Sequence, residues 1–584
     1  MIKFRPMVFT ICFIMIAADI FPQDNAQQPR ASENDAELTI AGTEALYYQA
    51  MAVFSSDYQP AIPLSEDVQP IKSATGLAFQ IKSRMDEFNP DQRNLLQKIL
   101  ARPNLSHSTV SPDGRFRVHY TTVGNNAVSA IDMDNNSIPD YVDEAVFSLV
   151  RSYNIEIEDL GFRPPPDDGG VDGPEWDIYI TNVGGVYSWT NSETQLSSNP
   201  DRWTSYILVD NNYQHTPTTG VDGLRVSIAH EFHHMIQLGY NGRDDDDNGS
   251  FDDLFLMEMS STYMEDLVYD DINDYYYYLT PLFNNTNVAF DHVDGIKEYG
   301  QCIFFHYLEA RYQTAGLLRE IWDGVVDLPA LQALDIVFRN RESSLEEELA
   351  LYYGWNAATG SRADIVQFYP EGDFYPEIVL DSSTEFKNDT TITSALRPQA
   401  ARYYEFTRGD ESVILIPVHV DWSEDARSDT TMLVLSEGIS HPFYKSIGGN
   451  FSTRIIADRF LNWIGAALFR SGSGQTEIVT FNATKSNLSE DNLPGAFPNP
   501  LDLSTFSSTT IPFILNEPML VKLAIFGSSG QLVFEQEQYF DGGFQMMDWN
   551  AQNMNGRQVS GGIYIYYLFG DGELINRNKI AVVR

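Results

Sequence analysis

The sequence predicts a multidomain protein in which an α+β domain is followed by two β-sandwich domains. Its 584 residues are enough for three or four domains, at roughly 100–200 residues each. Between residues 106 and 375, short strand patterns come first and long helical patterns follow, an order that is typical of an α+β domain. Beyond about residue 375, alternating apolar runs punctuated by Gly and Asp favour β-sandwiches.

The composition indicates a globular protein with an acidic surface. Hydrophobic residues make up 43% of the chain, and 37 Lys and Arg against 82 Asp and Glu give a net charge of -45. This charge repels nucleic-acid phosphate and anionic membranes, so we expect no nucleic-acid partner. Beyond the N-terminus no segment reaches the ~18 uncharged apolar residues that a membrane helix needs, so we expect no transmembrane span.

The N-terminus has the layout of a secretory signal peptide. Lys3 and Arg5 precede an apolar run over residues 7–18, and a polar stretch follows. We predict a signal peptide over residues 1–26 and a secreted or cell-surface protein. Residues 27–105 are polar, carry a helical period over 85–100 and show no residue that suggests chemistry. We predict an N-terminal pro-region there, with an N-terminal cap on the following domain as the alternative.

The candidate catalytic and metal-binding residues lie in the domain predicted over residues 106–375. Strand patterns cover 115–122 and 176–181, and helical patterns cover 141–158, 223–239, 254–268 and 296–313. The second helical pattern contains the motif H-E-x-x-H, formed by His230, Glu231 and His234, within an otherwise apolar helix. Because positions i and i+4 share one helix face, both imidazoles can bind one zinc ion while Glu231 acts as general base.

A third zinc ligand is needed, since catalytic zinc typically has three protein ligands and one open position. Glu258 lies 24 residues beyond His234 on the next predicted helix, where a returning helix would present it. Asp252, Asp253 and Asp266 are the rival candidates. His233 lies between the two ligands on another face, so we expect it on the surface or in packing.

Residues 254–265 (L-F-L-M-E-M-S-S-T-Y-M-E) resemble the third-ligand helix of the gluzincin metallopeptidases, such as the aminopeptidase N group. Over residues 107–330 the chain is similar to a family of exported bacterial zinc metalloproteases, in I-P-D-Y-V-D-E, G-F-R-P-P, D-I-Y-I and H-E-F-x-H. The resemblance implies a zincin-like metalloprotease fold, Glu258 as zinc ligand and Glu265 as the acidic residue beneath it. The connection between the two helices is longer than in gluzincins, and no Gly follows Glu258.

These residues predict a zinc metallopeptidase that hydrolyses peptide bonds of a protein or peptide substrate, with zinc as Lewis acid and Glu231 as base. Endopeptidase activity is favoured, because no G-x-M-E-N-like motif for a substrate amine is present. Tyr299 is a candidate donor to the developing oxyanion, with core packing as its alternative role. The alternative function is a calcium-stabilised surface adhesin or binding protein with a structural or inactive zinc site.

Two Asp-rich loops have spacings similar to EF-hand calcium loops. The first carries oxygen ligands at loop positions 1, 3, 5, 9 and 12, with Ser137 in place of the usual Gly. These ligands are Asp132, Asp134, Asn136, Asp140 and Asp143. The second offers Asp244, Asp246, Asn248 and Asp252 but lacks a ligand at position 12. We predict calcium at both, with an acidic, solvated turn as the alternative.

The remaining chain predicts two β units. Alternating runs at 412–420 and 430–435 support a β-sandwich over 376–487, and strand patterns at 509–515, 521–533 and 560–568 support an immunoglobulin-like domain over 488–584. The motifs F-P-N-P, D-W-N and S-G-G-I-Y resemble those of C-terminal sorting or FlgD-like domains of exported bacterial proteins. This resemblance implies an anchoring module recognised by secretion and sorting machinery; a substrate-binding accessory domain is the alternative.

Overall fold

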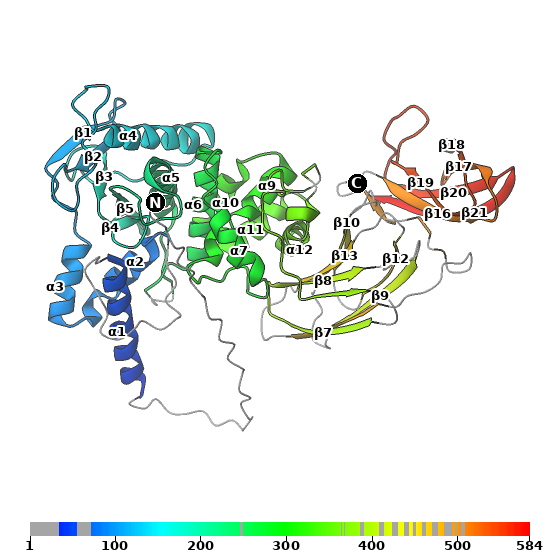
Figure 1. Ribbon diagram of the computed structural model, residues 1–584, viewed down its shortest axis with the longest axis horizontal. Helices are drawn as coiled ribbons and strands as arrows, with labels where there is room; N and C mark the ends of the chain where they lie inside the picture. Colours follow the sequence, from blue (N-terminus) through cyan, green and yellow to red (C-terminus); the bar gives the residue numbers. More distant parts are fainter. Residues whose placement is uncertain are drawn as a thin grey trace, which may run out of the picture.

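The computed structural model contains both helices and sheets, distributed over several units along the chain (Figure 1). It describes residues 34–54, 72–245, 249–363, 365–366, 368–385, 390–407 and 508–583, together with the strands between 414 and 483 and positions 493, 495–496 and 499–503. The predicted signal peptide over residues 1–26 and parts of the pro-region lie outside the described residues. Among the residues described, no helix is long and apolar enough to cross a membrane.

A five-stranded mixed sheet lies between residues 107 and 210, ahead of the helices that carry most of residues 220–356. Its strand order is β1-β2-β3-β5-β4, and β4 is an edge strand. The pairs β2/β3 and β3/β5 are parallel, whereas β1/β2 and β4/β5 are antiparallel. The strands are β1 (His107–Val110), β2 (Phe116–Tyr120), β3 (Trp176–Thr181), β4 (Ser188–Leu196) and β5 (Asn199–Asp210).

The two faces of this sheet are covered by different parts of the chain. Because side chains alternate along a strand, Ile178 and Ile180 face one side while Tyr179 faces the other. The first side packs against α4 (Asp140–Tyr153) and α5 (Gly220–Tyr240), where Phe232 joins the main core. The second side packs against α1 (Asn34–Phe54), α2 (Thr75–Ser83) and α3 (Pro90–Ile99). In Figure 1, α1 to α3 lie on the opposite side of the sheet from α4.

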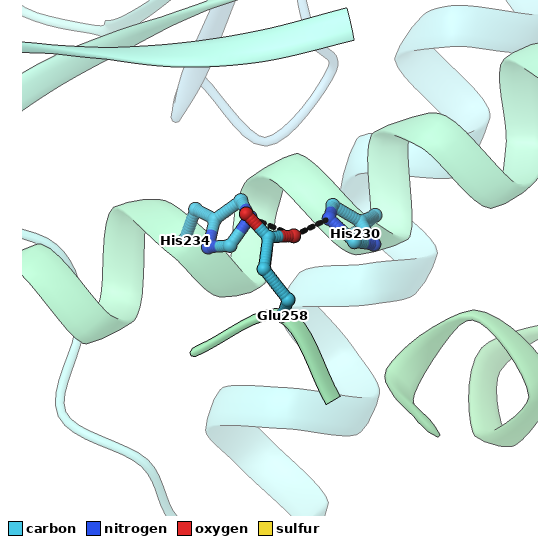
Figure 2. A group of neighbouring side chains, drawn as sticks. All are labelled: His230, His234 and Glu258. Atoms are coloured by element: carbon cyan, nitrogen blue, oxygen red, sulfur yellow. Dashed lines mark hydrogen bonds and ion pairs between the residues drawn. The ribbon is translucent and has the colours of Figure 1, made fainter. Parts of the chain in front are cut away.

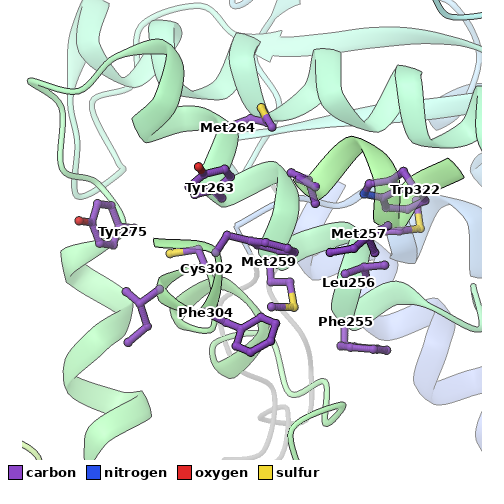
Figure 3. Packing of buried hydrophobic residues seen from close by; sticks show 14 of the residues in the cluster. Phe255, Leu256, Met257, Met259, Tyr263, Met264, Tyr275, Cys302, Phe304 and Trp322 are labelled. Atoms are coloured by element: carbon purple, nitrogen blue, oxygen red, sulfur yellow. The ribbon is translucent and has the colours of Figure 1, made fainter. Parts of the chain in front are cut away.

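A helical half follows the sheet. The helix α6 (Leu254–Val268) packs against α5, and its large apolar side chains meet Phe304 and Trp322 from later helices (Figure 3). Helix α5, which carries H-E-x-x-H, and helix α6, which carries Glu258, therefore belong to one continuous core. The later helices are α7 (Tyr276–Asn284), α8 (Lys297–Gly300), α9 (Ile303–Tyr312), α10 (Leu317–Val325), α11 (Ala330–Arg339) and α12 (Leu345–Asn356), followed by the short 3₁₀ turn η3 (Gly360–Arg362).

Several predicted helices are confirmed and two are interrupted. The helix predicted over 254–268 has those bounds, and the one predicted over 141–158 continues from α4 into the π-helix η2 (Asn154–Asp159). The pattern over 85–100 is divided into η1 (Met85–Glu87) and α3, because Asn89 caps a new helix that begins at Pro90. The pattern over 296–313 is divided between α8 and α9.

In the predicted unit at 376–487, the described residues form nine strands in two sheets, ordered β11-β10-β13-β8-β6 and β12-β9-β14-β7. Its β-rich character is therefore confirmed at the level of the backbone. The strands are β6 (Ser382–Glu385), β7 (Thr390–Leu396), β8 (Ala401–Thr407), β9 (Ile414–Trp422), β10 (Thr430–Ser436), β11 (Phe443–Ile447), β12 (Phe451–Ala457), β13 (Trp463–Phe469) and β14 (Glu477–Ala483).

The C-terminal unit has a hydrophobic core of its own. Ile511 and Phe513 from the two-stranded sheet β16-β19 pack against Leu523 and Tyr566 from the five-stranded sheet β15-β21-β20-β17-β18. Two sheets packed across one core form the predicted sandwich. The strands are β15 (Leu501–Asp502), β16 (Thr509–Leu515), β17 (Met519–Gly527), β18 (Leu532–Phe540), β19 (Gly543–Trp549), β20 (Gly562–Gly570) and β21 (Glu573–Val583).

Candidate metal centre

Helices α5 and α6 bring together the three residues predicted as zinc ligands. His230 and His234 are one helical turn apart on α5, and Glu258 projects toward both from α6 (Figure 2). The Oε2 atom of Glu258 lies 3.1 Å from Nε2 of His230 and 3.4 Å from Nε2 of His234. One donor atom from each residue lies within 4.8 Å of the others, so the three side chains can hold a metal ion.

The donor set fits a metal ion. His234 Nε2 is buried and makes no hydrogen bond to any described residue. A buried polar atom without a partner is costly, and an ion coordinated by this nitrogen would remove that cost. Two imidazoles and a carboxylate are also the ligand types that divalent zinc takes in proteins. The predicted metal ligands therefore form a site that can bind a metal ion.

The ring nitrogens that face away from Glu258 are each held by a second side chain. His230 Nδ1 lies 2.7 Å from Oε1 of Glu265, and His234 Nδ1 lies 2.6 Å from Oε1 of Gln237. The Gln237 amide nitrogen donates to the backbone oxygen of Met257 on α6, which fixes the orientation of the amide. These bonds keep both Nε2 atoms directed at the centre, as in many metal sites.

The electrostatics of the centre favour positive charge next to Glu258. Burial opposes protonation of His230, but hydrogen bonds to Glu258 and Glu265 outweigh it and raise the pKa of His230 to about 9. Burial would raise the pKa of Glu258, but the neighbouring His234 and His230 outweigh it and lower that pKa to about 2. A carboxylate held ionised among imidazoles provides the negative charge that a cation needs.

Glu231 points toward the edge strand of the sheet. Its Oε1 accepts a hydrogen bond of 2.8 Å from Ser188, and its Oε2 accepts one of 2.7 Å from Thr190, both on β4. A third hydroxyl, from Thr75 in the N-terminal region, donates to Oε2 at 3.1 Å. The predicted base therefore lies between α5, β4 and Thr75 of the N-terminal region, and it is fully buried.

Tyr299 lies beside the centre in α8, with its ring centroid 6.2 Å from that of His230. Its hydroxyl accepts a hydrogen bond of 3.1 Å from the backbone N–H of Ser73. Burial, together with the charge of Glu258, raises the pKa of this phenol well above its usual range. Tyr299 thus remains a neutral hydroxyl near the predicted ligands, and both of its predicted roles stay open.

The rivals of Glu258 have other partners. Asp253 accepts a hydrogen bond of 3.0 Å from the backbone N–H of Ala330, Asp252 accepts one of 3.1 Å from the backbone N–H of Asp245, and Asp266 faces His306 at 3.9 Å. His233 is buried rather than on the surface, and its Nδ1 lies 2.8 Å from Glu156. Of the four carboxylates considered, Glu258 is the one that meets both histidines.

The first Asp-rich loop is folded around its acidic residues. Asp132, Asp134 and Asp140 present carboxylate oxygens close to one another. Ser137, which replaces the usual Gly, adopts φ 74°, so this loop makes the left-handed turn without a glycine. Asn136 faces Asp134 and Asp143 with its amide nitrogen, at 3.1 and 3.0 Å, and in this conformation it donates rather than offering a ligand oxygen.

The second Asp-rich loop is described in part. Asp244 accepts a hydrogen bond of 2.9 Å from the backbone N–H of Gly249, and Asp252 accepts the bond from Asp245. Asp246 and Asn248 lie outside the described residues. The calcium prediction for this loop therefore stays a prediction.

Sequence reasoning missed Lys72, whose ammonium group lies against the centre. Its Nζ is 2.6 Å from Oε2 of Glu265 and 2.5 Å from Oδ2 of Asp274. Lys72 lies in a polar stretch without periodicity, and Glu265 is 193 residues away along the chain. No local pattern could have predicted this contact. Ser188, Thr190 and Gln237 were missed for a related reason, since isolated polar residues carry no signal of their own.

No protein-family model matches the chain, and no curated protein matches it. Among solved structures, matches include PorZ, an essential bacterial surface component of the type-IX secretion system of Porphyromonas gingivalis (20% identity, 20% of this chain and 14% of that one, TM-score 0.13). Dimeric latent PorU from the same organism matches at 15% identity, over 35% of this chain and 19% of that one, with TM-score 0.14.

A β-glucuronidase from Bacteroides uniformis matches at 12% identity, over 38% of this chain and 30% of that one, with TM-score 0.14. The chain thus spans less than a third of the length of each of these three structures. TM-scores this low carry no argument about fold, activity or partners.

Proposed function

We propose that the protein is an exported zinc metallopeptidase that hydrolyses peptide bonds in proteins or peptides. One observation carries the proposal. Two histidines of H-E-x-x-H and Glu258 from the adjacent helix converge within 4.8 Å in a buried site, and the motif's Glu231 lies between those histidines on the same helix. A purely structural site has no use for a base at that position.

When bound, zinc would supply Lewis-acid activation of the scissile carbonyl and of the attacking water. His230, His234 and Glu258 would hold the ion, with Glu265 and Gln237 keeping the two imidazoles in place. Glu231 would accept the proton of the attacking water on its carboxylate and return it to the leaving amine. Tyr299 is a candidate donor to the carbonyl oxygen, because its hydroxyl is neutral and lies beside the centre.

The other expectations form part of the same proposal. We assign a zincin-like fold to residues 106–375, calcium to the first Asp-rich loop, and an address or anchoring role to the C-terminal sandwich. Secretion and sorting machinery would then be the partner of that sandwich, and the protein would be secreted or held at the cell surface. The residue patterns support these assignments.

The proposal is tested by measuring zinc content and hydrolysis of a peptide library for Glu231→Gln and its parent. Because Thr75 of the predicted pro-region contacts Glu231, the comparison is made twice. Wild type is compared with Glu231→Gln, and Lys72→Met is compared with Lys72→Met that also carries Glu231→Gln. We expect zinc to be retained and hydrolysis to fall by at least about a hundredfold, since the base is lost but no ligand is.

Two outcomes would contradict the proposal. Absence of zinc from every purified protein would remove the metal centre, and equal hydrolysis with and without Glu231 in both backgrounds would remove the mechanism. Stoichiometric zinc without hydrolysis in any chain would favour the alternative, a binding protein with a structural zinc site.

A further inference from the structure

Residues 72–75, which we call the blocking segment, lie along the outer edge of β4, the edge that pairs with no other strand of the sheet. Ser73 pairs with Ser188 in a parallel bridge. The backbone N–H of Tyr187 donates to the Lys72 oxygen at 2.9 Å, and the N–H of Ala74 donates to the Ser188 oxygen at 3.0 Å. The segment therefore satisfies the edge of the sheet as an added strand would. An edge strand can accept the backbone of another extended peptide in the same way.

The blocking segment also contacts the proposed catalytic groups. The Ser73 N–H donates to the Tyr299 hydroxyl, and the Thr75 hydroxyl donates to Glu231. His230, Glu231 and His234 are 1%, 0% and 0% exposed in this arrangement. The groups of the centre are therefore closed to a peptide in this conformation, and Ser73 and Thr75 lie against two of the groups that a peptide would have to reach.

The ammonium group of Lys72 is surrounded by two carboxylates and two tyrosine rings. The pocket, which we call the Lys72 pocket, consists of Tyr187, Glu265, Asp274 and Tyr278. Two carboxylates lie within 2.6 Å of the ammonium nitrogen, and the two tyrosine rings lie 5.1 and 5.2 Å from it. Such carboxylates and aromatic faces select a cation over a neutral group of the same size.

The pocket is connected to the metal centre through Glu265. One oxygen of this carboxylate bonds His230 and the other bonds Lys72. A cationic side chain seated in the pocket therefore places the residues that follow it beside Tyr299 and Glu231, as Ser73 and Thr75 are placed. The same pocket and strand edge can position a peptide that is not part of the chain.

We propose that the Lys72 pocket is a substrate subsite for a lysine or arginine side chain, and that residues 72–75 occupy it as a built-in blocking segment that keeps the chain latent. This inference rests on the proposed peptidase function. It adds a substrate class, peptides with a basic residue next to the reacting bond, and a means of control.

The first test measures access to the centre without using hydrolysis. The zinc-loaded full chain is mixed with dipicolinate, and the rate of zinc removal is compared for wild type, Lys72→Met and the control Lys82→Met. Lys82 lies in the same N-terminal region but bonds the backbone oxygen of Ser192 instead of the centre. We expect zinc removal to be at least tenfold faster in Lys72→Met and unchanged in Lys82→Met.

The second test measures binding to the pocket. Labelled peptides that contain Lys-Ser-Ala-Thr, or norleucine in place of the lysine, are titrated into Lys72→Met and followed by fluorescence anisotropy. We expect the lysine peptide to bind at least tenfold more tightly. The preference should disappear in the double variant Lys72→Met with Asp274→Asn. This double variant leaves one buried carboxylate, that of Glu265, without its ammonium partner, whereas Lys72→Met alone leaves two, so the double variant is the better folded of the pair if burial of unpaired charge destabilises the single variant.

The outcomes separate this inference from the proposed function. Zinc bound in all variants, with equal removal rates in wild type and Lys72→Met, would overturn the blocking role alone. Equal affinity for lysine and norleucine peptides, or a lysine preference that survives Asp274→Asn, would overturn the subsite. Absence of zinc in every variant would overturn both the proposed function and this inference.

Discussion

His230, His234 and Glu258 were predictable because helix geometry is local. An i, i+4 pair lies on one face of any α-helix, and a carboxylate on the next helix can meet it once the two helices pack. The groups that hold these ligands were not all predictable. Glu265 lies two turns from Glu258 on α6, and its role as the acidic residue beneath Glu258 followed from the family resemblance. Lys72, by contrast, meets Glu265 and Asp274 through contacts that are long-range in the sequence.

Asp266 illustrates a residue whose environment only the structure reveals. Its side chain is buried near His306, and its Oδ1 has no hydrogen-bond partner among the described residues. Burial, reinforced by the charges of Glu371 and Asp270, raises the pKa of Asp266 to about 8. The neutral acid is therefore the form that the folded protein favours.

We predict that Asp266→Asn stabilises the protein in a pH-dependent manner. An Asp in the unfolded chain ionises near its ordinary pKa of 3.8, so folding takes up a proton between that pH and about 8, and wild-type stability falls as pH rises through this window. The advantage of the variant should grow from pH 4 to pH 8 and then level off, at an order of several kcal/mol, since a tenfold change in an ionisation constant corresponds to about 1.4 kcal/mol. Urea unfolding across pH measures it; a pH-independent difference would contradict the environment described.

Among the elements, the helices were predicted better than the strands. The apolar period over residues 254–268 predicted both ends of α6 correctly. The break before α3 arises because Asn89 caps a new helix that begins at Pro90. The strand β4 was missed because most of its residues after Trp189 are polar and show no apolar alternation. Its role follows from that polarity, since its Ser and Thr hydroxyls bond Glu231. Its outer edge pairs with Ser73 of the blocking segment.

The first Asp-rich loop gives a prediction at the scale of one element. Burial and the charges of Asp134, Asp140 and Asp132 raise the pKa of Asp143, despite an opposing hydrogen bond from Asn136, so the loop gathers negative charge that a cation would relieve. Calcium should raise the unfolding temperature, because a ligand at a hundredfold excess over Kd stabilises the fold by about 2.7 kcal/mol.

The matched comparison for calcium uses Asp132→Asn with Asp134→Asn, and Asp167→Asn as control. Asp167 lies in another exposed loop, where it accepts a hydrogen bond from Gly169. Calorimetry with added calcium should show the shift in wild type and the control and lose it in the double variant. A shift of the same size in all three proteins would place the calcium elsewhere.

At the scale of the whole molecule, the described part of the N-terminal region, residues 34–54 and 72–105, packs against the sheet. Leu77 and Leu96 pack with Tyr179 and Trp189 in a separate hydrophobic cluster on the outer face of the sheet. Composition predicted a pro-region but could not place it, because its helices obtain their partners from strands that come much later in the chain. The C-terminal unit was more predictable, since its alternating strands supply both sides of their own core.

We propose that His230, His234 and Glu258 form one zinc centre in the intact chain. The most direct measurement is zinc affinity at equilibrium, by competition with a chromophoric chelator, for wild type, Glu258→Ala and Asp266→Asn. Asp266 is the matched control because it is a carboxylate on the same helix that does not meet the histidines. We predict about one zinc per wild-type chain, unchanged affinity in Asp266→Asn and at least about a hundredfold weaker binding in Glu258→Ala. Wild-type affinity in Glu258→Ala would contradict the account.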